Sequence, residues 1–291
     1  MRRTVWFHAA LAAFMWAVPA SGQCGIDVVE CRPDAPRWVG EFASLSANAL
    51  LGGLTAGVTR RISGGSFGDA FLQGLLGGGA VYAGKRIAAE RFAGAGLIGR
   101  QVAATGTSIV LNVGRGLPAF DRLLLPIGPL RLELALAERS WSVRSDAVAL
   151  GWLLYGITES ELELDWGRSL SSGTAVFRTN GTLISFDGEE AHAAGVTNAG
   201  IVYAADVPVY GERVLQRSLA HERIHVLQQD FIAAAWTDPL VDAVLVRTAP
   251  GRILQAHVSI NLSTELMRAF GRLIPAHEDR PWEIESIFFA R

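Results

Sequence analysis

The spacing of apolar residues changes near residue 119, and this change constrains the fold more than any other feature of the chain. Before it, the stretch 42–116 is rich in Gly, Ala, Leu and Ser, and the length of its apolar runs indicates helices. After it, apolar and polar residues alternate, as in "RLELALAE" at 131–138, which is typical of half-buried strands. A helical part followed by an antiparallel sheet predicts a mixed α+β fold.

From residue 119 onward the sequence predicts an antiparallel meander of about four to six strands. The β-prone segments are 131–138, 141–157, 161–166, 174–186 and 199–207. The segment 174–186 has the form of a hairpin around Asn180-Gly181, because these residues tolerate the positive φ of a type I′ turn.

Helices are expected again toward the C-terminus, over 212–234, 239–247, 263–273 and 279–291. The last of these begins with Asp279 and Pro281, which are favoured at helix starts. We therefore divide the chain into a leader over 1–22, a Gly/Ala-rich and mostly helical region over 23–118, and a region over 119–291 that carries the meander and the later helices.

The N-terminus predicts an export signal. Two arginines among the first three residues precede an apolar run over 4–18, and Ala20 and Gly22 supply the small residues of a cleavage site. We expect cleavage near Gly22-Gln23 and a periplasmic or secreted protein.

The two cysteines, Cys24 and Cys31, follow this site closely. In an oxidising compartment they are expected to form a disulfide across a small loop. Gln23 stands where a lipidated chain needs a small residue, so lipidation of Cys24 is not expected.

The glycines of the helical region allow two interpretations. Pairs such as Gly53/Gly57 and Gly74/Gly78 place small residues on one helix face, where two backbones can approach closely. This is typical of a membrane hairpin and also of tightly packed helices in a soluble protein. The uncharged run 42–59 is at the lower limit for spanning a bilayer. Packed soluble helices are the default expectation, and membrane association through 42–116 stays open.

The charge balance argues against nucleic acid as a partner. The chain has 26 Lys and Arg against 28 Asp and Glu, a formal net charge of −2, and no basic run that could follow a phosphate backbone.

The stretch "LAHERIHVLQQ" (219–229) contains the candidate metal-binding and catalytic residues. His221 and His225 are four residues apart, so a helix presents both imidazoles to one metal ion. Glu222 lies about 100° further round, where it can take a proton from a water without binding the metal. Ser218, Gln228 and Gln229 continue a polar stripe on this helix. A buried polar stripe needs partners, and a zinc ion would satisfy it.

The same eleven residues resemble the active-site helix of zincin-type zinc metallopeptidases, in which Leu-Ala often precedes the motif and Gln follows it. The resemblance covers about 200–291 and is specific only over the quoted stretch. It implies a sheet whose edge strand binds substrate, then the active helix, then a helical region that carries the third zinc ligand.

The third ligand depends on the subgroup. Metzincins would have Gly at 228 and His at 231, and this chain has Gln228 and Phe231, so that subgroup is excluded. Gluzincins take a glutamate from a later helix, and "PWEIES" (281–286) is similar to their pattern, which makes Glu283 the expected ligand. Glu285 is the second choice, and it could instead orient a ligand histidine, because Ile287 occupies the place of the usual Asp. Further candidates are Glu265, His277 and Glu278.

The leading hypothesis is an exported metallopeptidase that uses Zn²⁺ to hydrolyse peptide or protein substrates, with Glu222 as general base. Tyr203, Tyr210 and His277 are candidates for the group that stabilises the oxyanion. Two alternatives stay open: a non-catalytic protein of this type at the cell envelope, and a membrane-associated protein acting through the Gly-rich helices. The sequence leaves the oligomeric state open.

Overall fold

The structure is a computed structural model that describes residues 36–179, 195–205, 211–274 and 280–290. The expected export signal, the Cys24–Cys31 disulfide and the second strand of the hairpin expected over 174–186 lie outside these residues.

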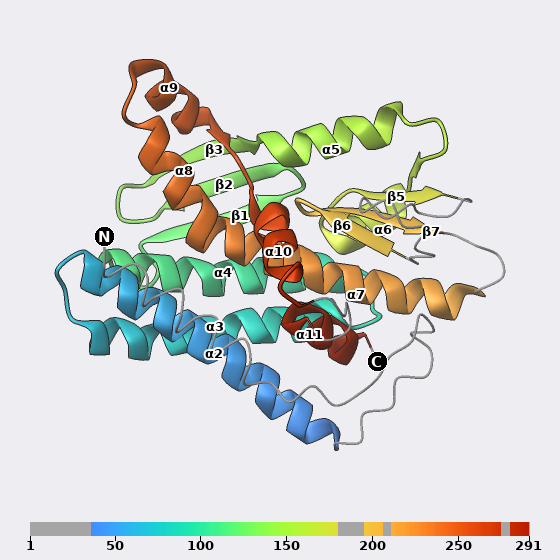
Figure 1. Ribbon diagram of the computed structural model, residues 1–291, viewed down its shortest axis with the longest axis horizontal. Coiled ribbons are helices and arrows are strands. Elements are labelled where there is room, and N and C mark those ends of the chain that lie inside the picture. Colours follow the sequence, from blue (N-terminus) through green and yellow to red (C-terminus); the bar gives the residue numbers. More distant parts are fainter. Residues whose placement is uncertain (1–35, 180–194, 206–210, 275–279, 291) are drawn as a thin grey trace.

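The described helices are α2 (Arg37–Ile62), α3 (Phe67–Ala88), α4 (Ala95–Arg115), α5 (Ala147–Thr158), α6 (Trp166–Ser172), α7 (Gly211–Ile232), α8 (Asp238–Leu245), α9 (Ala249–His257), α10 (Ser263–Gly271) and α11 (Pro281–Phe289). The described strands are β1 (Arg122–Ile127), β2 (Leu130–Ala135), β3 (Ser140–Asp146), β4 (Glu163–Leu164), β5 (Val176–Thr179), β6 (Gly195–Asn198), β7 (Ile201–Ala205) and β8 (Val258–Ser259). A π-helical turn, η1 (Ala233–Thr237), joins α7 to α8. Helices α2 to α4 form one layer, the sheets form another, and α7 runs between them (Figure 1).

The mixed α+β class is confirmed, but the sheet arrangement differs from the expected single meander. Strands β1, β2 and β3 are a true antiparallel meander. In the described part of the chain the strands form two sheets, in the orders β1-β2-β3-β8 and β4-β5-β7-β6. Each sheet contains one parallel pair, β3 with β8 and β5 with β7, because later segments return to pair with earlier strands.

The expectation of strand structure was confirmed at the start of 141–157 and at Glu163–Leu164 within 161–166, and was wrong for the rest of both segments. Strand β3 ends at Asp146, whose carboxylate accepts hydrogen bonds from the backbone N–H groups of Val148 and Ala149 and so starts α5. Asp165 starts α6 in the same way, by accepting from the N–H of Arg168. In both places a side-chain cap outweighs the β propensity of the residues that follow.

The C-terminal helices agree well with expectation. Helices α7, α8, α10 and α11 occupy the four predicted segments, whereas α9 and β8 were not predicted. Helix α7 is buried nearly all round, since its apolar residues Leu215, Leu219, Ile224 and Leu227 are each at most 5% exposed.

Glycine allows α2, α3 and α4 to pack with their backbones close together. A Cβ at Gly52 would lie 2.5 Å from the carbonyl oxygen of Gly74 and 2.8 Å from Cα of Gly78. Gly53 and Gly57 lie against side chains of α3 instead of its backbone: Leu75 and Phe71 at Gly53, and Phe67 at Gly57. The expected close approach is therefore real, with Gly52 as the partner of Gly74 and Gly78.

By length and hydropathy alone, α2 is the one helix among the described residues that could cross a membrane, and 39% of its most apolar window is buried inside the protein.

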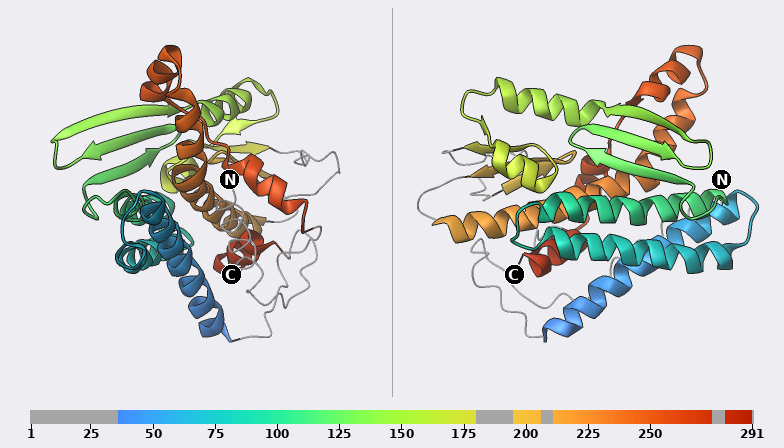
Figure 2. Two further views of the ribbon diagram at one scale, coloured as in Figure 1. Left: turned by 60° about the vertical axis from the view of Figure 1, so that its left-hand side comes forward. Right: turned by 180° about the vertical axis from the view of Figure 1, so that it is seen from behind.

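One cluster of buried side chains joins the helical layer to α7 and the second sheet. It includes Ala56 of α2, Val81 of α3, Val110 of α4, Val202 of β7 and Leu219 of α7. The views in Figure 2 show α7 beside both layers. Helix α7 is thus packed between the helical layer on one side and the second sheet on the other.

Candidate metal centre

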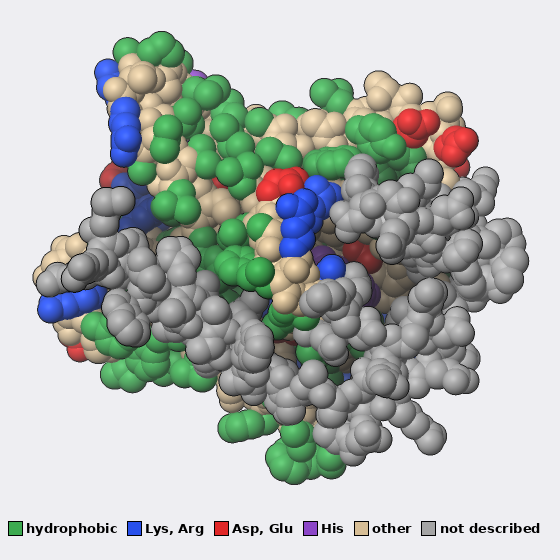
Figure 3. Space-filling view, viewed as in Figure 1, with side chains coloured by type: hydrophobic (Ala, Val, Ile, Leu, Met, Phe, Trp, Pro, Cys, Tyr) green, Lys and Arg blue, Asp and Glu red, His purple; other side chains and the backbone are tan. Residues whose placement is uncertain are grey.

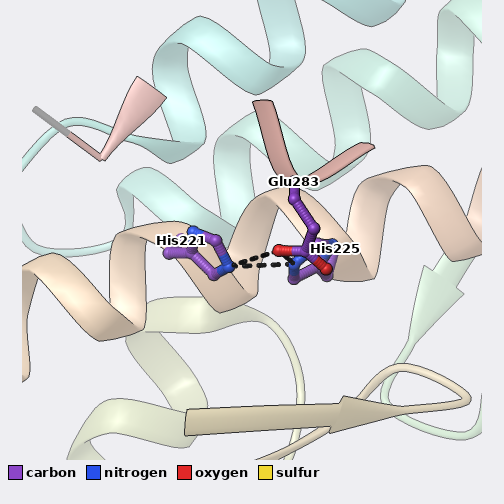
Figure 4. Close-up of side chains that lie close together, drawn as sticks. All are labelled: His221, His225 and Glu283. Carbon is purple, nitrogen blue, oxygen red and sulfur yellow. Dashed lines mark hydrogen bonds and ion pairs between the residues drawn. The ribbon is translucent and has the colours of Figure 1, made fainter. Parts of the chain in front are cut away.

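Two histidines of α7 and one glutamate of α11 bring three ligand atoms together (Figure 4). His221 and His225 are one helical turn apart, and their Nε2 atoms are separated by 2.9 Å. Oε2 of Glu283 lies 3.2 Å from Nε2 of His221 and 3.1 Å from Nε2 of His225. The three residues expected to be ligands therefore converge on one point, although Glu283 follows the motif by more than fifty residues.

The electrostatics of this triangle favour a positive charge at its centre. Burial opposes a charged imidazole, but the neighbouring Glu283 carboxylate raises the pKa of His225 to about 9. Burial would also raise the pKa of Glu283, yet the two imidazoles hold that pKa well below its usual range. A buried carboxylate that favours a protonated imidazole would also favour a metal cation at the same place.

A glutamine orients the His225 ring. Nδ1 of His225 lies 2.8 Å from Oε1 of Gln228, so Nδ1–H donates to the amide oxygen and Nε2 faces Glu283. The amide nitrogen of Gln228 donates to Oε2 of Glu285 at 2.8 Å and to the carbonyl oxygen of Trp282 at 3.1 Å. These bonds fix which imidazole nitrogen is free to act as a ligand.

Glu285, the second choice for the third ligand, lies away from the triangle and supports it indirectly. Its Oε2 also accepts from Nζ of Lys85 at 2.6 Å. Its Oε1 accepts from Nδ2 of Asn48 at 2.6 Å and from Oγ of Ser44 at 2.9 Å. Burial would raise the pKa of Glu285, but Lys85 and these hydrogen bonds hold it below its usual value. Residues of α2 and α3 thus position the histidine through Glu285 and Gln228.

The predicted general base, Glu222, is buried beside the edge strand β6. Oγ1 of Thr197 donates to its Oε2 at 2.7 Å. Gly195 of the same strand leaves room for the carboxylate, because a Cβ there would lie 2.7 Å from Cγ of Glu222. Glu222 is also close enough to His225 to contribute to the rise of that pKa.

The hairpin that carries Thr197 was only half predicted. Strand β7 was expected, but β6 and the two-residue turn at Ala199-Gly200 were not. Both turn residues have positive φ, 47° and 82°, and the sequence Asn-Ala-Gly at 198–200 was the available signal. Gln229 holds this hairpin on α7, since its Oε1 accepts from the N–H of Gly200 at 2.8 Å and its Nε2 donates to the carbonyl of Thr197.

The remaining predicted residues do not join the site. The hydroxyl of Tyr203 donates to the carbonyl of Trp152 at 2.7 Å, on the opposite face of β7, so Tyr203 was a wrong choice for stabilising the oxyanion. Glu265 is exposed and pairs with Arg268. Tyr210, His277 and Glu278 lie outside the described residues.

The site is partly open to solvent. The His221 side chain is 15% exposed, whereas that of His225 is 8% exposed. Histidine side chains are visible in a hollow near the middle of the face shown in Figure 3. Within the described part of the chain, the buried Nδ1 atom of His221 has no hydrogen-bond partner.

No family model, curated protein or solved structure matches the chain.

The chemistry of the site follows from its donors: two neutral imidazoles and one carboxylate can hold a divalent cation, and a second carboxylate beside them can accept a proton.

Proposed function

We propose that the protein is an exported zinc metallopeptidase that hydrolyses peptide bonds with Glu222 as general base. The observation that carries this proposal is the convergence of His221, His225 and Glu283, three donors of the kinds that zinc binds in hydrolytic enzymes.

The size of the triangle is compatible with a bound zinc ion. Ligand atoms at about 2.0–2.1 Å from a tetrahedral zinc ion lie about 3.3 Å from one another. The separations of 2.9, 3.1 and 3.2 Å are a few tenths of an ångström shorter, so the side chains need to move only slightly to accept the ion. His221, His225 and Glu283 would hold the ion with three protein ligands, and a water could then bind it as well, as hydrolysis requires.

When bound, a zinc ion supplies Lewis acidity and lowers the pKa of water toward 7. Glu222 takes a proton from the attacking water and returns it to the leaving amine. Thr197 holds the carboxylate of Glu222 in place through its hydroxyl hydrogen bond. Gln228 keeps Nε2 of His225 directed at the centre.

The edge strand β6 supports a peptide substrate. In the described sheet β6 pairs with β7 alone, so its other edge can accept an extended chain by strand addition. Because Thr197 of β6 contacts Glu222, a peptide bound there lies next to the proposed base.

The test is the variant Glu222→Gln in the zinc-loaded protein. We expect one zinc per chain as in the wild type, and a loss of about 10²–10⁴-fold in cleavage of a fluorescently labelled, unstructured protein. The matched control is Glu265→Gln on the exposed surface, which should leave cleavage unchanged. A zinc-loaded wild type without cleavage above the Glu222→Gln background would contradict the catalytic proposal and leave a non-catalytic zinc protein.

A further inference from the structure

The meander β1–β3 carries a face that is apolar except for Ser145, which lies opposite Leu130. Its register places Leu123 opposite Leu134, and Leu134 opposite Trp141. The next row contains Leu125, Leu132 and Val143. Side chains that are cross-strand neighbours lie on the same side of a sheet, so these six residues share one face. The pair Ile127 and Leu130 extends it.

The charged side chains of the same strands point into the protein. Arg131 of β2 forms an ion pair with Asp238 of α8. Nη2 of Arg144 in β3 lies 2.8 Å from Oδ1 of Asp242, also in α8. The sheet is therefore reversed relative to a usual half-buried sheet, with its polar face against a helix and its apolar face outward.

No described element covers the apolar face. Strands β1 to β3 lie in front of α8 in the right-hand view of Figure 2, so this face is turned away from α8. Trp141 is 71% exposed and Ile127 57%. The four leucines of β1 and β2 in the two rows are only half-buried. Such a face normally packs against another layer.

Helix α4 already covers the β1 edge of this sheet. A packing partner is therefore expected on the apolar face and not at this edge. Side chains of α4 bind the outer edge of β1: Oγ of Ser108 accepts from the N–H of Leu124 at 2.9 Å, and Nδ2 of Asn112 donates to the carbonyl of Arg122 at 2.8 Å. Strand addition at β1 is thereby blocked.

We propose that this face is a self-association interface, on which the same face of a second copy packs across a two-fold axis as a β-sandwich. A two-fold axis brings like residues together, and this face has no charge that would repel its own copy. Sheets pack face to face at about 10 Å through interdigitated apolar side chains of this kind.

The area is sufficient for a dimer. With the exposures of its side chains, the face offers roughly 600 Å² per copy, or on the order of 1,200 Å² in total, which reaches the range of specific interfaces.

A second copy fits better than a lipid surface. Arg122 stands at the rim of the sheet, but it pairs with Glu133 at 3.1 Å and with Glu138 at 3.0 Å. This rim cation is neutralised within the protein, and Arg139 in the exposed β2–β3 turn is a single further basic residue, whereas attachment to anionic lipid relies on clusters of free basic residues.

The test is sedimentation equilibrium of the full chain over a range of concentrations. We expect a monomer–dimer equilibrium in the wild type. The double variant Trp141→Lys/Val143→Lys should raise the dissociation constant by about 100-fold or more, because it buries like charges against each other. Both positions are exposed in the single chain, so the circular dichroism of the variant should match that of the wild type.

The matched control is Leu72→Lys/Leu76→Lys, which replaces two exposed leucines of α3 and should leave the dimer intact. A wild type that stays monomeric at all concentrations overturns the proposal. A dimer that persists in the Trp141→Lys/Val143→Lys variant overturns it as well. A monomer that cosediments with phosphatidylglycerol vesicles, and loses this binding in the same variant, would identify a lipid surface instead.

Discussion

At the scale of single residues, the candidate site separates two neighbouring glutamates by function. Glu283 and Glu285 are two apart in α11, so their side chains leave the helix in different directions. Glu283 reaches the histidines, whereas Glu285 reaches Lys85, Asn48 and Gln228. One change at each position can therefore distinguish a ligand from a residue that positions a ligand.

Glu283→Gln is expected to abolish stoichiometric zinc binding, because it replaces the carboxylate that joins both imidazoles. Glu285→Gln is expected to keep one zinc per chain with about 10–100-fold weaker affinity, since Glu285 acts on the zinc ligands only through the orientation of His225. Zinc content after dialysis and competition with a chelator measure both effects. The opposite result, with zinc lost only in Glu285→Gln, would exchange the two roles.

The Glu285 change should also cost folding stability. Lys85 is 4% exposed, and without a carboxylate partner its charge is buried and unpaired. We expect Glu285→Gln to lower the free energy of unfolding by about 3–5 kcal/mol, as measured by urea denaturation. The double variant Lys85→Met/Glu285→Gln should recover part of this loss. A single variant as stable as the wild type would contradict the buried pair.

The metal-free protein should lose stability as the pH rises. The pKa of His225 is raised from its ordinary value of 6.5 to about 9 in the folded state. Its protonation therefore contributes stability that is complete below pH 6.5 and disappears as the pH passes 9. We expect urea denaturation with a chelator present to show a decrease of about 1–3 kcal/mol across this range. His225→Gln should flatten the profile; an unchanged profile in that variant would exclude His225 as its source.

At the scale of elements, the spacing of α2 and α3 determines whether Asn48 and Lys85 can both reach Glu285. Gly78 of α3 lies against α2, where a Cβ would overlap the carbonyl oxygen of Asn48. A Cβ added at the neighbouring Gly79 would have no neighbouring atom within 4 Å. These adjacent glycines form a matched pair for testing the contact.

Gly78→Ala should lower the free energy of unfolding by about 1–3 kcal/mol because the helices must separate. Gly79→Ala should be neutral or raise it by up to about 1 kcal/mol through helix propensity. Thermal and urea unfolding of both variants measures the difference. Equal effects at the two positions would show that α2 and α3 do not approach this closely in solution.

At the scale of the whole molecule, local sequence patterns predicted more than long-range pairing. The spacing of His221 and His225 and the turn of helix that carries Glu222 are local, so they were predictable. Glu283 required a resemblance to known peptidases, because nothing in its surroundings shows which residues fold next to it. The role of Lys85 was not predictable, since it lies 200 positions from its partner Glu285. The sequence indicated a buried partner for Lys85 only through the position of this charged residue within an apolar, Gly-rich helix.

The strands show the same limit. Alternation did not identify β1, whose sequence RLLLPI does not alternate. It identified β2 and placed its leucines on one face, but it could not show that this face points outward. That outcome depends on Asp238 and Asp242 of α8, which draw the arginines of the opposite face inward. The short cap at Asp146, which turns a β-prone run into α5, was equally decisive and was available in the sequence.

The proposed zinc site is tested most directly by a crystal structure of the zinc-loaded protein with diffraction data on both sides of the zinc absorption edge. We expect one anomalous peak within about 2.0–2.2 Å of Nε2 of His221, Nε2 of His225 and a carboxylate oxygen of Glu283. We also expect Glu285 to stay bound to Lys85 and Gln228. A fully occupied zinc elsewhere, or a peak that any of the three side chains does not reach, would contradict the proposed site.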